Sequence, residues 1–131
     1  NGDKSKRAVL RPDFMVLFYP VISSDPKYSH AGSFNNLLGK GYTEETRKAW
    51  SPELLVSEKT PQALFILSDD DKAVKPTNST LLYNAMKKLN IPASLHILPE
   101  GGHGWGMRDS FRYKAVWQQT VLDYLKHINQ Q

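Results

Sequence analysis

The sequence predicts an α/β fold in which parallel strands with flanking helices form a three-layer αβα arrangement. Two apolar runs, residues 13–19 (DFMVLFY) and 63–67 (ALFIL), show no polar alternation, which is typical of strands covered on both faces. After residue 60, strands alternate with helices, and this order favours βαβ units with right-handed crossovers. The predicted order is strand, long loop, strand, helix, strand, helix.

Residues 21–60 are predicted to form a long excursion, because they are rich in Ser, Pro, Gly and Asn and lack a strong hydrophobic period. Within it we expect one short helix at 43–49, capped by Thr43. We also expect a helical turn at 51–55, where a serine precedes a proline at the first helical position.

The second half of the chain has clearer periodicity. A helix is predicted at 76–90, and its apolar face is made of Leu81, Leu82, Ala85, Met86 and Leu89. Residues 93–98 (ASLHIL) alternate, as expected for a strand nearer the sheet edge. Residues 110–128 form the last predicted helix, with apolar residues at spacings of three and four.

The composition excludes several classes of function. A chain of 131 residues with 40% hydrophobic residues is long enough for one domain with one core. Its net charge of +4 comes from scattered basic residues, which argues against nucleic-acid binding, and no apolar run approaches the roughly 20 residues of a membrane span. Without cysteine and with four scattered histidines, the sequence predicts no metal or other cofactor.

Two loops that follow neighbouring predicted strands carry the candidate chemistry. Residues 68–71 (SDDD) come directly after one strand, and His103 follows the next in LPEGGHGWG (98–106). In parallel sheets, chemistry gathers at the carboxyl ends of the strands, and an acid beside an imidazole is the orienting pair of a Ser-His-Asp triad. Each feature alone is also typical of an ordinary turn. Their joint placement favours the catalytic interpretation.

At this point the sequence resembles a known family. Residues 61–108 (PQALFILSDDDKAV…LPEGGHGWGMR) resemble the acid and histidine segments of α/β-hydrolases, nearest to the esterase and dienelactone-hydrolase-like branch with its bacterial acetyl-xylan-esterase-like proteins. RPDFMVLFYPVIS and HAGSFNNLLG, further upstream, resemble the sixth strand of those esterases and the excursion after it. The resemblance runs from Arg11 onward. It implies an ester hydrolase of three-layer αβα fold.

The resemblance also assigns roles to residues. Asp71, in DKAV, matches the triad acid, with Asp70 as the alternative, and His103 matches the triad histidine. His30, in the excursion, would border the acyl pocket and contact substrate. Trp105 either walls the cleft and stacks on a sugar or packs in the core.

A hydrolase triad also needs a serine, in a GxSxG elbow upstream of the acid. No serine of this sequence stands in such a motif: AGSFN at Ser33 lacks the second glycine, and Ser23 and Ser24 lack flanking glycines. We therefore expect residues 1–131 to be the C-terminal part of a single hydrolase domain. Without nucleophile and oxyanion hole, this part should have no ester turnover by itself.

Three functions remain open from the sequence. The first is the C-terminal part of a serine carboxylic-ester hydrolase acting on a small ester or an acetylated polysaccharide, for which the periplasm or secretion is favoured. The second is a non-catalytic interaction module, which would self-associate because the strand at 13–19 lacks an upstream neighbour. The third is the end of a prolyl-oligopeptidase-type serine peptidase, whose acid and histidine loops are of the same kind.

Overall fold

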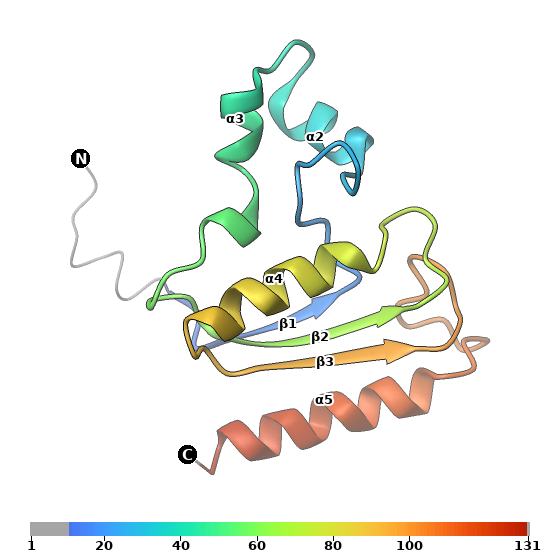
Figure 1. The fold of residues 1–131 in the computed structure, drawn as a ribbon. Coiled ribbons are helices and arrows are strands. Elements are labelled where there is room, and N and C mark those ends of the chain that lie inside the picture. Colours follow the sequence, from blue (N-terminus) through green and yellow to red (C-terminus); the bar gives the residue numbers. More distant parts are fainter. Residues whose placement is uncertain (1–10, 131) are drawn as a thin grey trace.

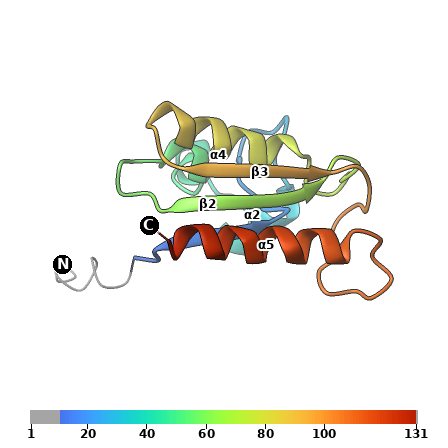
Figure 2. The same ribbon diagram turned by 90° about the horizontal axis from the view of Figure 1, so that it is seen from below.

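The computed structural model describes residues 11–130, which form a three-stranded parallel sheet in the order β1-β2-β3. Helices α4 and α5 lie on opposite faces of the sheet (Figures 1 and 2). The elements that make up the three layers are β1 (Phe14–Phe18), β2 (Gln62–Ser68), α4 (Thr77–Lys88), β3 (Ala93–Leu98) and α5 (Lys114–Ile128). The predicted three-layer α/β fold is confirmed. Within residues 11–130, no helix is long and apolar enough to cross a membrane.

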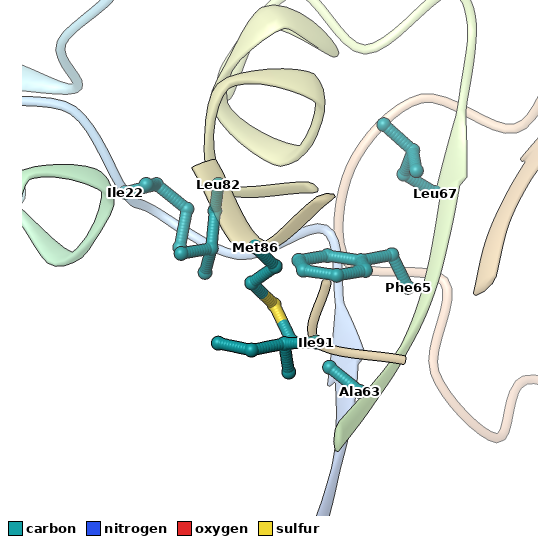
Figure 3. Packing of buried hydrophobic residues seen from close by; sticks show 7 residues of the cluster. All are labelled: Ile22, Ala63, Phe65, Leu67, Leu82, Met86 and Ile91. Carbon is teal, nitrogen blue, oxygen red and sulfur yellow. The ribbon is translucent and has the colours of Figure 1, made fainter. Parts of the chain in front are cut away.

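The central strand β2 is the core of the molecule, and its residues 63–67 are at most 1% exposed. Alternate side chains of a strand point to opposite faces, so β2 contributes to two clusters. The cluster beneath α4 contains Ile22, Ala63, Phe65, Leu67, Leu82, Met86 and Ile91. Figure 3 shows the ring of Phe65 pointing toward Met86 of α4. The cluster beneath α5 contains Leu64, Ile66, Leu98, Trp105 and Trp117.

The excursion between β1 and β2 holds more helix than the sequence predicted. Helix α3 (Glu44–Lys48) and the short 3-10 helix η1 (Pro52–Leu54) lie where they were expected, and the Thr43 hydroxyl accepts the Thr46 N–H at 3.1 Å. Helix α2 (Ala31–Leu38) was missed. Its glycine and asparagines are poor helix formers. Tertiary contact overrides this weak propensity, since Phe34 is only 3% exposed.

Two helices also differ from the predictions in where they begin or end. Helix α5 begins at Lys114 rather than at residue 110, because residues 107–113 form turns that bring the ring of Phe111 onto Trp105. Helix α4 ends at Lys88, so Leu89 lies beyond its last turn and is 44% exposed rather than on the buried face. Strand β3 pairs with β2 alone in the described part of the chain, as its predicted place at a sheet edge requires.

Asn78, in the first turn of α4, ties the chain after β1 to the helix. Its side chain is fully buried and uses all of its usual partners. The Oδ1 atom accepts the N–H groups of Ile22 and Ser23 at 3.0 and 2.9 Å. The Nδ2 atom donates to the carbonyls of Tyr28 and Lys75 at 2.9 and 3.1 Å. One side chain therefore supplies hydrogen-bond partners to the backbone of Ile22, Ser23 and Tyr28.

Replacing Asn78 with alanine should lower the free energy of unfolding by about 2–3 kcal/mol, because it leaves buried backbone groups without partners. Urea unfolding followed by tryptophan fluorescence measures the loss. Asn84→Ala is the matched control, since Asn84 is exposed on the same helix and should change stability by less than about 0.5 kcal/mol. Equal losses in the two variants would contradict the role of Asn78.

Candidate active site

Three segments of the chain meet at the carboxyl edge of the sheet. The register pairs Phe18 with Ile66 and Ser68 with Leu98, so the three strands end close together. The loop after β2 and the loop after β3 leave the sheet at this same end (Figure 1). The backbone N–H of Asp69 donates to the carbonyl of Leu98 at 2.8 Å and joins the two loops where they begin.

The predicted acid and histidine are in direct contact. The Nδ1–H of His103 donates to Oδ2 of Asp71 over 2.7 Å. The other oxygen of Asp71 accepts the N–H groups of Ala73 and Val74, both at 2.9 Å. The side chain of Asp71 is 1% exposed and that of His103 is 35% exposed. With Nδ1 donating, the neutral imidazole carries its lone pair on Nε2, which is the atom that can accept a proton.

The glycines around His103 give the loop a backbone that other residues rarely adopt. Gly101, Gly102, Gly104 and Gly106 all have positive φ. Gly101 combines a φ of +142° with close packing: a Cβ atom there would lie 2.5 Å from the ring of Phe111 and 2.9 Å from Oγ of Ser68. The loop can therefore pass over the end of β2 only with glycine at this position.

Asp70 is not bonded to the imidazole, but it holds the histidine loop. Its Oδ1 accepts the N–H of Gly102 at 2.8 Å, one residue before His103. This hydrogen bond is the main reason that the pKa of the Asp70 carboxyl lies below its usual value. The two neighbouring aspartates therefore have different partners: Asp71 is hydrogen-bonded to the imidazole, and Asp70 to the backbone N–H one residue before it.

Tyr19 is a residue of the site that the sequence reasoning missed. It follows β1 directly and has a φ of +36°, a conformation that costs about 1–2 kcal/mol in a residue other than glycine. Its ring lies 4.6 Å from the imidazole of His103, centre to centre, and 5.1 Å from the ring of Trp105. Its place at the carboxyl end of a strand is the signal that could have identified it.

The two residues predicted to contact substrate, Trp105 and His30, both make contacts within the chain. Trp105 is 1% exposed, stacks on Phe111 at 4.4 Å, and donates its Nε1–H to Oγ of Ser68 at 2.9 Å. Trp105 therefore packs in the core, which is one of its two predicted roles, and its stacking on a sugar stays a prediction. His30 caps α2, because its Nδ1 accepts the backbone N–H of Ser33 at 3.3 Å, and the same atom lies 2.9 Å from Oγ of Ser33. Its contact with substrate stays a prediction.

No group of three or more histidine, aspartate or glutamate side chains in residues 11–130 is arranged to hold a metal ion. The hydrogen-bonded pair of Asp71 and His103 has the chemical groups that proton transfer uses. A buried carboxylate and a half-exposed imidazole with a free Nε2 can accept a proton from a nucleophile and return it to a leaving group.

Comparisons with known proteins agree with this fold. A family model described as the prolyl oligopeptidase family matches residues 19–131. An acetylxylan esterase from Xylanibacter ruminicola is 40% identical over 91% of the chain, and endo-1,4-beta-xylanase B from Butyrivibrio fibrisolvens is 37% identical over 72%. The chain spans only 26% and 15% of the lengths of these relatives.

Solved structures show the same likeness. An acetyl ester-xyloside bifunctional hydrolase from Caldicellulosiruptor lactoaceticus is 36% identical, with a TM-score of 0.85 over 91% of this chain and 43% of its own. The carboxylesterase Cest-2923 from Lactobacillus plantarum has a TM-score of 0.72 at 21% identity, over 91% of this chain and 46% of its own, which shows the fold alone.

The chain has three parallel strands between helices, and its match to the solved hydrolase shows that this arrangement is part of an α/β-hydrolase fold. The chain belongs to the prolyl oligopeptidase family, and it is homologous to carboxylic-ester hydrolases. The predicted resemblance to α/β-hydrolases of the acetyl-xylan-esterase kind is confirmed.

Gly101→Ala should lower the free energy of unfolding by about 3 kcal/mol, because the new methyl group meets Phe111 and the backbone is strained. Gly102→Ala is the matched control: its φ is +63° but nothing lies within 4 Å of a Cβ there. It should cost only about 1 kcal/mol. Urea unfolding compares the two, and equal losses would show that close packing at Gly101 is not what requires glycine.

Proposed function

We propose that this chain is the acid- and histidine-bearing part of a serine carboxylic-ester hydrolase that removes acetyl groups from a polysaccharide of the xylan type or from small esters. The observation that carries the proposal is the 2.7 Å hydrogen bond between His103 and Asp71 at the carboxyl edge of the sheet. The choice of ester over other acyl substrates is supported by 40% identity to an acetylxylan esterase.

In this proposal His103 transfers a proton in both directions. As a serine hydroxyl from a segment outside this chain attacks the ester carbonyl, Nε2 takes the hydroxyl proton, and it then returns that proton to the leaving alcohol. In the second half, a water molecule gives a proton to Nε2 as it attacks the acyl carbon, the bond from that carbon to the serine oxygen breaks, and Nε2 returns the proton to the serine oxygen while acetate leaves. The carboxylate of Asp71, which accepts two backbone N–H groups, orients the imidazole and stabilises the imidazolium that forms.

Peptide hydrolysis is the second candidate, because the matching family is described by the name of a peptidase. The same acid and histidine serve either reaction, since both pass through a tetrahedral intermediate and an acyl-enzyme. Two relatives at 36–40% identity are named as acetyl ester hydrolases. We therefore favour the ester, and turnover of acetyl esters compared with peptide amides by the serine-bearing polypeptide distinguishes the two.

In the polypeptide that joins this chain to the serine-bearing segment, His103→Ala and Asp71→Asn should each lower kcat for an acetyl ester by about 10³–10⁴-fold. His96→Ala and Asp109→Asn are matched controls on exposed side chains and should leave kcat unchanged. The 131-residue chain alone should show no turnover, because it lacks a nucleophile in a GxSxG elbow. Serine-hydrolase rates from the chain alone, or full activity of His103→Ala, would contradict the proposal.

We also propose that the chain by itself self-associates through β1. This strand pairs with β2 on one side and has no strand on its other side within residues 11–130. An open edge with half-buried apolar side chains is a template for pairing.

Size-exclusion chromatography with light scattering should therefore find dimers or larger species. The joined polypeptide, with another strand beside β1, is the control and should be monomeric; a monomeric 131-residue chain at every concentration would contradict this.

A further inference from the structure

Tyr19 is placed against the imidazole of His103 by a backbone that departs from what its sequence favours. A residue before proline normally takes an extended backbone. Tyr19 precedes Pro20, yet its φ is +36°. Its N–H still donates to the carbonyl of Ile66 at 2.9 Å, so the turn begins while the residue remains part of the sheet. Surrounding contacts must therefore hold this conformation, and such strain gathers at functional sites.

The Tyr19 ring packs against both core clusters, and two of its ring contacts are with the histidine loop. The ring meets the imidazole at 4.6 Å with an angle of 61° between planes, and it meets the indole of Trp105 at 5.1 Å and 84°. The tyrosine Oη lies 3.7 Å from the place where a Cβ of Gly106 would be. Trp105 is itself enclosed in the core. The ring of Tyr19 therefore contacts both the enclosed Trp105 and the imidazole of His103.

The hydrogen bond to Asp71 fixes only one atom of the imidazole. The ring is also attached covalently at Cγ, so the motion left to it is a rocking through small changes of χ1 and χ2, which keeps Nδ1 near Asp71 but moves Nε2. A second contact on the ring removes this freedom, because aromatic pairs have preferred relative orientations. In residues 11–130, the imidazole is hydrogen-bonded to Asp71 and lies against the ring of Tyr19.

From this geometry we infer that Tyr19 is a positioning residue, whose ring holds the imidazole of His103 so that Nε2 points away from the sheet toward the nucleophile. The inference rests on the proposed function. It assigns the effect to the aromatic ring and not to the hydroxyl, because the ring makes the contact with the imidazole. Tyr19 touches no reacting atom, so it acts through His103.

The test compares Tyr19→Leu, which removes the ring, with Tyr19→Phe, which keeps it, in the polypeptide that carries the serine. Tyr19→Leu should lower kcat for an acetyl ester at least tenfold and change KM less than twofold, because binding of the ester does not use this ring. Tyr19→Phe should restore kcat to within threefold of the parent. Tyr83→Leu is the matched control, since Tyr83 packs on the other face of the sheet and should leave kcat unchanged.

Histidine-selective NMR gives a readout that needs no activity. The ring protons of His103, assigned by their loss in His103→Gln, should shift in Tyr19→Leu because the ring current of Tyr19 is gone, and should stay in place in Tyr19→Phe. Unchanged His103 signals or unchanged kcat in Tyr19→Leu would overturn the inference, and so would an equal loss of kcat in Tyr83→Leu or in Tyr19→Phe. If the NMR shift appears while His103→Gln retains full ester turnover, the proposed function fails and the ring contact stands.

Discussion

The complete burial of β2 is the constraint on which the rest of the structure depends. Its residues 63–67 are enclosed by α4 on one face and α5 on the other, with a strand on each edge. Burying a Leu, Ile or Phe side chain stabilises the fold by about 1.5–3 kcal/mol, and four of these five residues are of that kind. A slip of one residue would exchange the two faces of the strand. Register is therefore strongly specified, and the three strands end at one edge.

At that edge the acid and the histidine are held in different ways. Asp71 is buried and bonded through both oxygens, so its position is set by the end of β2. His103 lies on a glycine-rich loop, and three neighbours restrain it: Asp71 through the imidazole, Asp70 through the backbone of Gly102, and Tyr19 through its ring. In the proposed proton transfer, this division would leave the half-exposed imidazole open to substrate while the carboxylate that orients it stays buried.

Much of this arrangement could be predicted from the sequence, and what was missed has a common cause. The strands, α3, α4 and the meeting of the loop at 68–71 with the loop of His103 follow from local hydrophobic pattern and from the order of elements. Helix α2 was missed because its residues are poor helix formers, and it is held by burial of Phe34. The hydrogen bonds of Asn78 to the chain after β1 and the contact of Tyr19 with His103 were not predicted, because each joins segments more than 50 residues apart in the chain.

By itself, the sequence determined the fold class, the family resemblance and the residue types of the acid and histidine pair, because periodicity and motif spacing are local properties. Only the tertiary structure decided the roles within those motifs: Asp71 rather than Asp70 contacts the imidazole, Trp105 packs in the core, and Tyr19 lies against the histidine. Which of two neighbouring side chains reaches a partner depends on the backbone direction at the end of a strand. That direction is set by packing across the whole sheet, and no short stretch of sequence contains it.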